Sequence, residues 1–295
     1  MDFTLYLGDY AYSSWSLRGW LLLDAFGVPF ATRTAHMNTQ EFEELRSEMS
    51  PSRLVPALAI SDGVRAPVIV WDSMAIAETI HDHFPQAGLW PVGASARPVA
   101  RAIAAEMHAG FTALRSTCPM NMRRSYEGFV VSEDVKTDLK RLSDLWGHAR
   151  ARKTSDGPFL FGNFSAVDAF FAPVASRIAT YDLPIHDADM AYVTALLGHP
   201  SVRRWRAMGM ADRHLQDHYE FDYPERANPH DPDVSGTAVT GTQAENAFCP
   251  FSGKDVSPDS LVEVQGQVIG FCNTFCRDKV AADPFAWPDA AALLR

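Results

Sequence analysis

Residues 12–18 read Tyr-Ser-Ser-Trp-Ser-Leu-Arg and lie at the junction of a predicted strand and a predicted helix. Before them, apolar side chains alternate over residues 2–7, which is the period of a half-buried strand. After them, apolar residues recur at helical spacing over residues 16–26, and Gly-Val-Pro at 27–29 then ends the helix. A second extended segment at residues 30–33 would return beside the first strand, so the start of the chain predicts a β-α-β unit.

The chain that follows completes an α/β domain, to which we assign residues 1–85. Its further elements are a polar helix, an antiparallel hairpin and a capped helix, expected at residues 39–48, 55–60 with 68–71, and 74–84. Beyond this domain the pattern changes to long amphipathic helices, which predicts an all-α domain over residues 95–215. The helices are expected at residues 100–113, 132–152, 167–180, 188–197 and 202–208.

The last part of the chain divides into a polar stretch and a small module. Residues 216–244 are rich in Asp, Pro, Asn, Ser and Gly and are expected to form a linker. Residues 245–295 hold three of the four cysteines, and a segment this short builds little apolar core of its own. A module organised around a soft metal ion is therefore expected at the C-terminal end.

Composition excludes several classes of partner. The chain has 295 residues, 47% of them apolar, and its formal charge is 26 minus 36, or −10. No cluster of Lys and Arg is present, which disfavours nucleic acid and anionic membrane surfaces. No apolar run is long enough to span a bilayer and the first residues lack the features of a signal peptide, so we expect a cytoplasmic protein whose cysteines stay reduced.

The β-α-β-α-β-β-α order followed by an all-helical domain resembles the glutathione transferase fold over roughly residues 1–215. The resemblance implies a thioredoxin-like first domain and an all-α transferase domain. Residues 12–18 are similar to the start of the serine and zeta classes, in which paired serines precede the first helix. Trp15 stands where the zeta class has a cysteine, which favours general glutathione conjugation over the maleylacetoacetate isomerisation of that class.

The paired serines suit the chemistry that such an enzyme needs. A thiol with a pKa of about 8.5 is mostly protonated at neutral pH, and lowering that pKa by about two units requires roughly 2.7 kcal/mol. A hydroxyl donor and the N–H groups of a helix N-terminus can together stabilise the thiolate. We expect Ser13 to meet the sulfur, with Ser14 and Trp15 close by. The alternative is that one serine simply caps the helix.

Two further pieces of the resemblance concern the rest of glutathione. The family has a cis peptide before a proline at the third strand, and Val55-Pro56 stands at that position, where the Val55 backbone would pair with the cysteinyl part. Asp72-Ser73 resembles the acidic residue and serine that hold the γ-glutamyl end, although an Asp-Ser pair before a helix is also an ordinary N-cap. Arg53 and His36 are candidates for the glycyl carboxylate, or else solvated surface charges.

The helical domain carries a folding signal and a candidate second-substrate site. Ser165 and Asp168 form a capping-box pattern before an apolar run, a feature also found in the transferase family. After the first long helix, Met120 with Met122 could line an apolar pocket for an electrophile, and Arg123 or Arg124 could attract an anionic one. The alternative is core methionines and surface arginines.

The C-terminal cysteines resemble those of small zinc-ribbon, YHS or TRASH-like metal modules. Cys272 and Cys276 are one helical turn apart, and Cys249 precedes them by a long loop. Three thiolates suit zinc or copper(I), with Asp278, Asp283 or water as a fourth ligand. The alternative is a degenerate module, in which Ser252 replaces a ligand and the cysteines are buried or free.

The resemblance implies a homodimeric glutathione transferase that acts on a small hydrophobic electrophile, as in detoxification. The alternatives are a glutathione-dependent isomerase of the maleylacetoacetate type, or a glutathione-binding and metal-binding redox protein without transferase activity. The chain has no Cys-x-x-Cys pair and no cysteine near Ser13, which disfavours thiol–disulfide exchange.

Overall fold

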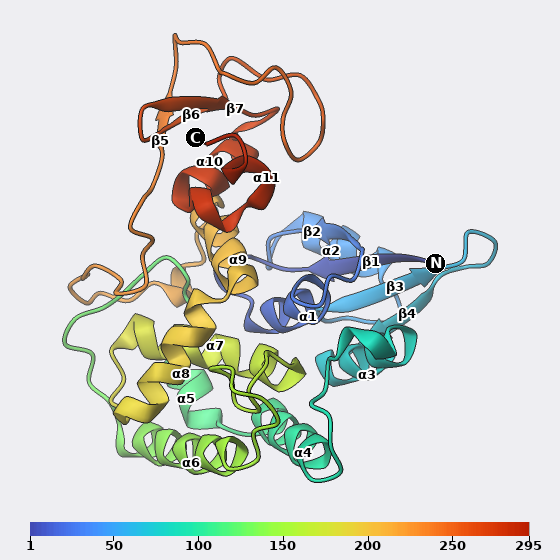
Figure 1. Ribbon diagram of the computed structural model, residues 1–295, viewed down its shortest axis with the longest axis vertical. Coiled ribbons are helices and arrows are strands. Elements are labelled where there is room, and N and C mark those ends of the chain that lie inside the picture. The colour runs from blue at the N-terminus through green and yellow to red at the C-terminus, as the bar shows by residue number, and fades with distance from the viewer. Residues whose placement is uncertain (295) are drawn as a thin grey trace.

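The computed structural model describes residues 1–294. Its N-terminal domain is a four-stranded sheet with helices packed on it (Figure 1). The strand order is β2-β1-β3-β4, with β1 parallel to β2 and antiparallel to β3, and β3 antiparallel to β4. The elements in chain order are β1 (Asp2–Leu7), α1 (Ser14–Asp24), β2 (Ala31–Thr34), α2 (Gln40–Glu48), β3 (Ala57–Ser61), β4 (Val68–Trp71) and α3 (Ser73–His83). This is the order that the sequence predicts.

Helix α1 is the best-buried element of this domain. Its residues from Ser16 to Leu23 are all buried, because one side faces the sheet and α3 while the other faces the helical domain. Gly19 allows α1 to approach the loop before β3, since a Cβ at this position would lie 2.6 Å from Cβ of Pro56. The close approach packs the middle of α1 directly against the Val55–Pro56 loop.

The helical domain is built around α7 (Ala166–Tyr181), every residue of which is buried. The helix begins with the expected capping box: the backbone N–H of Ser165 donates to Oδ2 of Asp168 at 2.8 Å, and the Ser165 side chain caps the third helical position. The surrounding helices are α4 (Ala96–Ala109), α5 (Thr112–Thr117), α6 (Glu133–Arg150), α8 (Asp187–Gly198) and α9 (Pro200–Ala211), with the 3-10 turn η1 (Pro85–Ala87) before them.

One expected helix is divided in two. The sequence predicts a single helix over residues 100–113, but α4 ends at Ala109 and α5 begins at Thr112. Between them Phe111 has a φ of 58°, in the left-handed region that interrupts a right-handed helix. The break separates α5 from α4, and α5 carries Thr112, Arg115 and Ser116, which line a cleft between the two domains.

The C-terminal module is a three-stranded antiparallel sheet with short helices. Strands β5 (Thr237–Val239), β6 (Leu261–Val264) and β7 (Gln267–Gly270) pair in that order, and α10 (Thr274–Ala282), η3 (Pro284–Ala286) and α11 (Pro288–Ala291) follow. Helix α10 packs on α9, which connects the module to the helical domain (Figure 1). Arg203 of α9 reinforces this contact with two hydrogen bonds of 2.8 and 2.7 Å to the Asp283 carboxylate.

The stretch 216–244 is more structured than the linker that the sequence predicts. Its first residues, including the 3-10 turn η2 (Asp217–Tyr219), pack against two loops of the N-terminal domain. Gln216 donates to the carbonyl of Met37, in the loop after β2, at 2.7 Å, and Glu220 accepts from the hydroxyl of Tyr12, in the loop before α1, at 2.8 Å. Its last part forms β5 of the C-terminal sheet. Polar composition suggested a linker, but these polar groups pair with specific partners. Over residues 1–294, the helices are all too short or too polar to cross a membrane.

Candidate functional site

A cleft of about 450 Å³ lies between the N-terminal domain and the helical domain. One wall is the loop before α1 together with the first turn of α1, and the other wall is formed by α5, the segment after it, α7 and the turn η2. The lining residues include Tyr12, Ser13, Ser14, Trp15, Thr112, Arg115, Ser116, Met120, Arg177 and Tyr219. The structure thus brings together four predicted site residues, namely Ser13, Ser14, Trp15 and Met120.

Ser13 caps helix α1. Its Oγ accepts a hydrogen bond from the backbone N–H of Ser16 at 3.3 Å and lies 2.8 Å from Oγ of Ser16. Ser16 Oγ also accepts a hydrogen bond from the N–H of Gly8 at 2.9 Å. The capping role considered for these serines is therefore confirmed for Ser13, but Ser13 also lines the cleft and carries a hydroxyl proton that can be redirected.

Ser14 differs from Ser13 in its surroundings. It is the first residue of α1, it is half-buried, and within residues 1–294 its hydroxyl has no hydrogen-bond partner. The backbone N–H groups at the start of α1 point along the helix axis at the same place. This end of the cleft therefore offers hydroxyl and amide donors to an anion.

Tyr12 contributes its ring to the cleft, while its hydroxyl is used elsewhere. The hydroxyl donates to Oε1 of Glu220 at 2.8 Å and accepts from Nη1 of Arg123 at 3.2 Å. Burial and the hydrogen bond to Glu220 raise the pKa of Tyr12 to about 12. A phenol held in this way is a poor donor to a thiolate in the cleft.

Trp15 contacts two arginines. The guanidinium carbon of Arg18 is 4.5 Å from the centre of the indole and that of Arg115 is 4.8 Å from it, and the ring of His108 meets the indole edge to face at 5.0 Å. Cation–π contacts of this kind orient both guanidinium groups. Neither arginine was predicted as a site residue.

Asp72 and Ser73 lie at the start of α3 and join this group through His108. Asp72 caps α3 by accepting from the N–H of Met74 at 2.8 Å, which confirms the N-cap alternative, and its other oxygen lies 3.1 Å from Nε2 of His108. Ser73 is fully buried, with its hydroxyl 3.5 Å from Nδ1 of His108. Burial lowers the pKa of His108, while Asp72 opposes this effect.

The backbone at Asp72 is strained, with a φ of 73° in a residue that has a side chain. Such a conformation costs on the order of 1–3 kcal/mol and persists where surrounding structure enforces it, often at binding sites. Here the capping hydrogen bond and the contact with His108 hold the carboxylate near the strained position.

The remaining residues expected to bind glutathione have different environments. The Val55–Pro56 peptide is cis, as expected, and the Val55 side chain packs near Gly8. Arg53 is exposed and, within the described chain, makes no ion pair. His36 is engaged elsewhere: its Nε2 lies 2.9 Å from the Asp212 carboxylate, so this nitrogen is not free to bind a glycyl carboxylate.

The arginines expected at the electrophile site do not line the cleft. Arg123 donates to the carbonyls of Gly209 and His214 at 2.8 and 2.7 Å, and Arg124 pairs with Glu220 and Glu225 at 2.8 and 2.7 Å. Arg123 therefore binds the C-terminal end of α9 and the segment after it, and Arg124 binds that segment alone. Two other arginines face the cleft, Arg115 of α5 and Arg177 of α7. The sequence could have pointed to Arg177 only as a charged residue inside an apolar helix, a signal that the prediction did not use.

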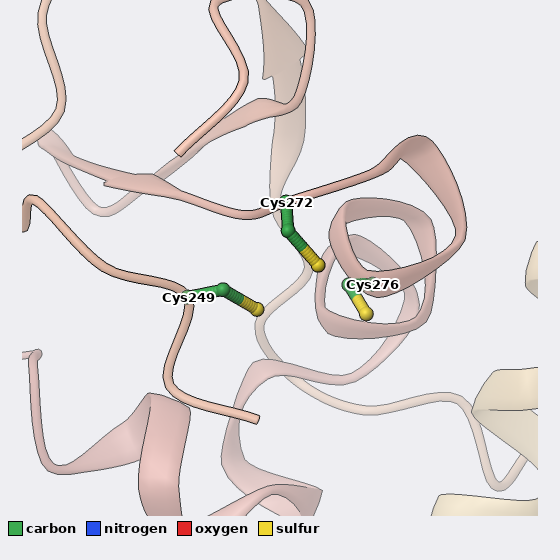
Figure 2. A group of neighbouring side chains, drawn as sticks. All are labelled: Cys249, Cys272 and Cys276. Atoms are coloured by element: carbon green, nitrogen blue, oxygen red, sulfur yellow. The ribbon is translucent and has the colours of Figure 1, made fainter. Parts of the chain in front are cut away.

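The three C-terminal cysteines form a cluster (Figure 2). Their sulfur atoms lie within 4.8 Å of one another, and the side chains come from the loop before β6, the loop after β7 and the first turn of α10. Cys249 is buried, whereas Cys272 and Cys276 are partly exposed. Among residues 1–294, no acidic or histidine side chain joins this group.

The surroundings of the cluster favour a thiolate at one position. Burial opposes ionisation of Cys249, but backbone N–H groups from Cys272, Phe251 and Ser252 and the Ser252 hydroxyl outweigh it and lower its pKa to about 7. Burial raises the pKa of Cys276 to about 11.

The acidic residues considered as a fourth ligand are both engaged elsewhere. Asp278 pairs with Arg277 and Arg213 at 2.6 and 3.2 Å, and Asp283 pairs with Arg203. One oxygen that does contact the cluster is Ser252 Oγ, which lies 3.3 Å from the sulfur of Cys272. A fourth position would therefore fall to Ser252 or to water.

Comparison with known proteins agrees with the fold. Residues 12–83 match the family model described as the glutathione S-transferase N-terminal domain, a stretch that contains Ser13, Pro56 and Ser73. No protein with a curated description matches the sequence at a significant level.

Several solved structures are similar to most of the chain. A glutathione transferase homolog from Burkholderia gl BGR1, determined with bound glutathione, is 22% identical, with a TM-score of 0.51 over 70% of this chain and 96% of its own. Glutathione transferase Omega 3C from Trametes versicolor is 20% identical, with a TM-score of 0.52 over 70% and 88% of the two chains. A homolog from Lodderomyces elongisporus, with two glutathione molecules per subunit, is 14% identical, with a TM-score of 0.53 over 70% and 98%. The thioredoxin-like domain and the helical domain therefore have the glutathione transferase fold.

Proposed function

We propose that this protein is a glutathione transferase in which Ser13 and the N-terminal end of α1 stabilise the glutathione thiolate. The observation that carries the proposal is the position of Ser13 and Ser14 at a helix N-terminus that opens into the interdomain cleft. The family match over residues 12–83, a stretch that contains Ser13 and Ser14, supports it.

The proposed reaction uses the chain's residues to hold an anion and to orient two substrates. The glutathione thiol loses its proton to solvent, and the thiolate accepts hydrogen bonds from the Ser13 hydroxyl and the first N–H groups of α1. The sulfur forms a bond to the electrophilic carbon, and a leaving group such as chloride departs with its bonding electrons. Asp72 and Ser73 would hold the γ-glutamyl end, the Val55 backbone the cysteinyl part, and Arg53 a carboxylate.

The test is turnover of a chloronitrobenzene with glutathione by the Ser13→Ala and Ser14→Ala variants. We expect Ser13→Ala to lower kcat/KM by roughly 100-fold while the Kd for glutathione changes little, since the lost bond is strongest to the thiolate. Full activity in Ser13→Ala together with a loss in Ser14→Ala would move the role to Ser14. Full activity in both variants would refute a serine-assisted transferase.

We also propose that Cys249, Cys272 and Cys276 bind zinc or copper(I), because three sulfurs within 4.8 Å of one another are a donor set that these ions prefer. Three thiolates around a zinc ion would leave one negative charge. The ammonium of Lys279, held 3.6 Å from the ring centre of Phe251, lies near enough to the cluster for its charge to act on all three thiols. This site would stabilise the module whatever the activity of the other domains.

Native mass spectrometry of the full chain before and after acid denaturation tests this second proposal. We expect one metal ion per chain in the wild type and in Cys118→Ala, whose thiol is buried in the helical domain, and none in Cys276→Ser. Finding only metal-free chain in the wild type would remove the proposal.

We propose in addition that the chain forms a homodimer through the β3–β4 side of the N-terminal domain. Four large apolar side chains are exposed there, Leu54, Val64, Val68 and Trp71. They lie along the β3–β4 hairpin and in the loop before it, and several exposed apolar side chains on one element are a feature of interaction surfaces. Sedimentation equilibrium should give twice the chain mass for the wild type and the monomer mass for a Leu54→Glu, Val68→Glu double variant.

A further inference from the structure

The interdomain cleft carries positive charge on the wall opposite Ser13. Arg115 and Arg177 line it, and no Asp or Glu is among its lining residues. Arg177 is only 4% exposed; its Nε donates to the carbonyl of Cys118 at 2.8 Å and its Nη1 to that of Pro173 at 3.2 Å. Within residues 1–294, its Nη2 has no acceptor, so one edge of a nearly buried guanidinium is left for the cleft.

Arg115, like Arg177, is hydrogen-bonded only to backbone carbonyl groups within the described chain. Its Nη1 donates to the carbonyls of His108 and Gly110, both at 3.2 Å, and its other nitrogens have no acceptor in the described chain. The break between α4 and α5 supplies those carbonyls, and Trp15 supports the guanidinium from the side. Carbonyl groups orient a guanidinium but do not neutralise it.

A third arginine lies behind these two. Arg18 is 1% exposed, and its Nε and Nη1 are buried with no hydrogen-bond partner among the described residues. Its one acidic neighbour with an electrostatic effect is Asp72, which is already paired with His108. Burial, followed by the charges of Arg177 and Arg115, lowers the pKa of Arg18. Three cations thus share one region with little compensation.

An unpaired buried cation is costly, and its cost is offset when an anion is held against it. On the basis of the transferase function proposed above, we infer that the cleft binds the carboxylate of an anionic electrophile through Arg177 and Arg115, with Arg18 adding positive potential behind them. A guanidinium edge presents parallel donors that match the two oxygens of a carboxylate. Met120, Trp15 and Tyr219 would contact the apolar body of the same molecule. The substrate class is therefore a small apolar electrophile with a carboxylate, not a neutral one.

A matched pair of substrates tests this inference, a chlorodinitrobenzoate and its methyl ester, which share the reacting carbon and differ in charge. Turnover with glutathione is measured for the wild type, Arg177→Met, Arg177→Lys and Arg115→Gln. Arg141→Gln is the control, because Arg141 pairs with Glu106 on the outer face of α6, away from the cleft. Binding of dinitrobenzoate, which has no leaving group, is followed by quenching of tryptophan fluorescence.

We expect the wild type and Arg141→Gln to prefer the acid over the ester. Arg177→Met and Arg115→Gln should lower the acid-to-ester ratio of kcat/KM by about 10- to 100-fold, and Arg177→Lys should restore part of it. Dinitrobenzoate should bind the wild type and bind Arg177→Met at least about 10-fold more weakly.

Three outcomes are distinguishable. Equal use of acid and ester by the wild type and the variants would overturn the carboxylate site and leave the transferase intact. Binding of dinitrobenzoate without turnover of either substrate would refute the transferase and leave the anion site. An increase in KM for glutathione, the same for both electrophiles, would assign the arginines to a carboxylate of glutathione and overturn the inference.

Discussion

At the scale of single residues, Ser16 decides which way the Ser13 proton can point. Ser16 is fully buried, and its Oγ lies 2.8 Å from that of Ser13. A serine hydroxyl donates one hydrogen bond and accepts two, so this contact can run in either direction. When Ser16 donates to Ser13, the Ser13 proton is free to donate to a thiolate in the cleft. Ser16 is then a positioning residue for the proposed reaction.

Ser16→Ala tests that role. Losing the donor to Ser13 should raise the pKa of the bound glutathione thiol by about one unit and lower kcat/KM at neutral pH by about 10-fold. The pH profile of kcat/KM and the absorbance of the bound thiolate report the shift. If the alanine variant lost stability with an unchanged profile, Ser16 would serve only to satisfy the N–H of Gly8.

The local sequence was enough to predict which serines line the cleft. It was not enough to predict which arginines line the cleft. Ser13 and Ser14 are placed by the strand-to-helix junction, which a short stretch of sequence determines. Arg123 and Arg124 lie only a few residues beyond Met120, yet the chain turns them toward the segment after α9. That segment arrives from a distant part of the sequence, and residue spacing carries no information about it.

At the scale of elements, the helices that carry their own start signals were predicted most accurately. The Ser165–Asp168 capping box is a local pattern, and α7 begins where it predicts. The break between α4 and α5 has a weaker signal, since Gly110 alone does not end a helix and the left-handed Phe111 depends on tertiary packing. That break supplies the carbonyls that hold Arg115 and so affects the site directly.

Helix α9 starts at an unusual cap that makes the stability of this element depend on pH. Nδ1 of His199 accepts a hydrogen bond from the N–H of Ser201 at 3.2 Å, and the ring stacks on Phe164 with centres 4.1 Å apart. An imidazole accepts at this nitrogen only when it is neutral there. Burial and the charge of Arg204 lower the pKa of His199 from 6.5 to about 4.

Because this base has a lower pKa in the fold than in the unfolded chain, its contribution is complete above pH 6.5 and is lost as the pH falls toward 4. An asparagine would cap α9 without titrating. Over this interval we expect wild type to lose about 1–2 kcal/mol more stability than His199→Asn, a value reduced for partial exposure of the ring. Urea unfolding of both proteins at each pH gives the difference, and parallel curves would contradict the assignment.

At the scale of the whole molecule, the C-terminal module is attached to α9 and to the loop before α1. Arg203 binds the Asp283 carboxylate, and Phe275 of α10 stacks on Tyr10 with ring centres 5.9 Å apart. The cysteine spacing predicted a small module but not where the module docks. Docking depends on pairs of side chains that are far apart in the chain, such as Arg203 and Asp283, which are 80 residues apart. Phe275 of the module contacts Tyr10, and Tyr10 precedes Ser13 by three residues in the chain. This contact connects the module to the loop that lines the cleft.

The docking contact is expected to make the module unfold together with the rest of the chain. Asp283 is 8% exposed in its pair with Arg203, so Asp283→Asn leaves a partly buried cation unpaired and should cost about 1–3 kcal/mol. Asp231→Asn is the control, because Asp231 is 51% exposed in its pair with Arg206 and its substitution should change stability by less than about 0.5 kcal/mol.

Alkylation of Cys249, Cys272 and Cys276 in urea with a chelator reports unfolding of the module, and tryptophan fluorescence reports unfolding of the whole chain. The two transitions should coincide in the wild type and in Asp231→Asn, whereas alkylation should come at lower urea in Asp283→Asn. Coincident transitions in Asp283→Asn, at the wild-type midpoint, would show that the pair does not hold the module in place.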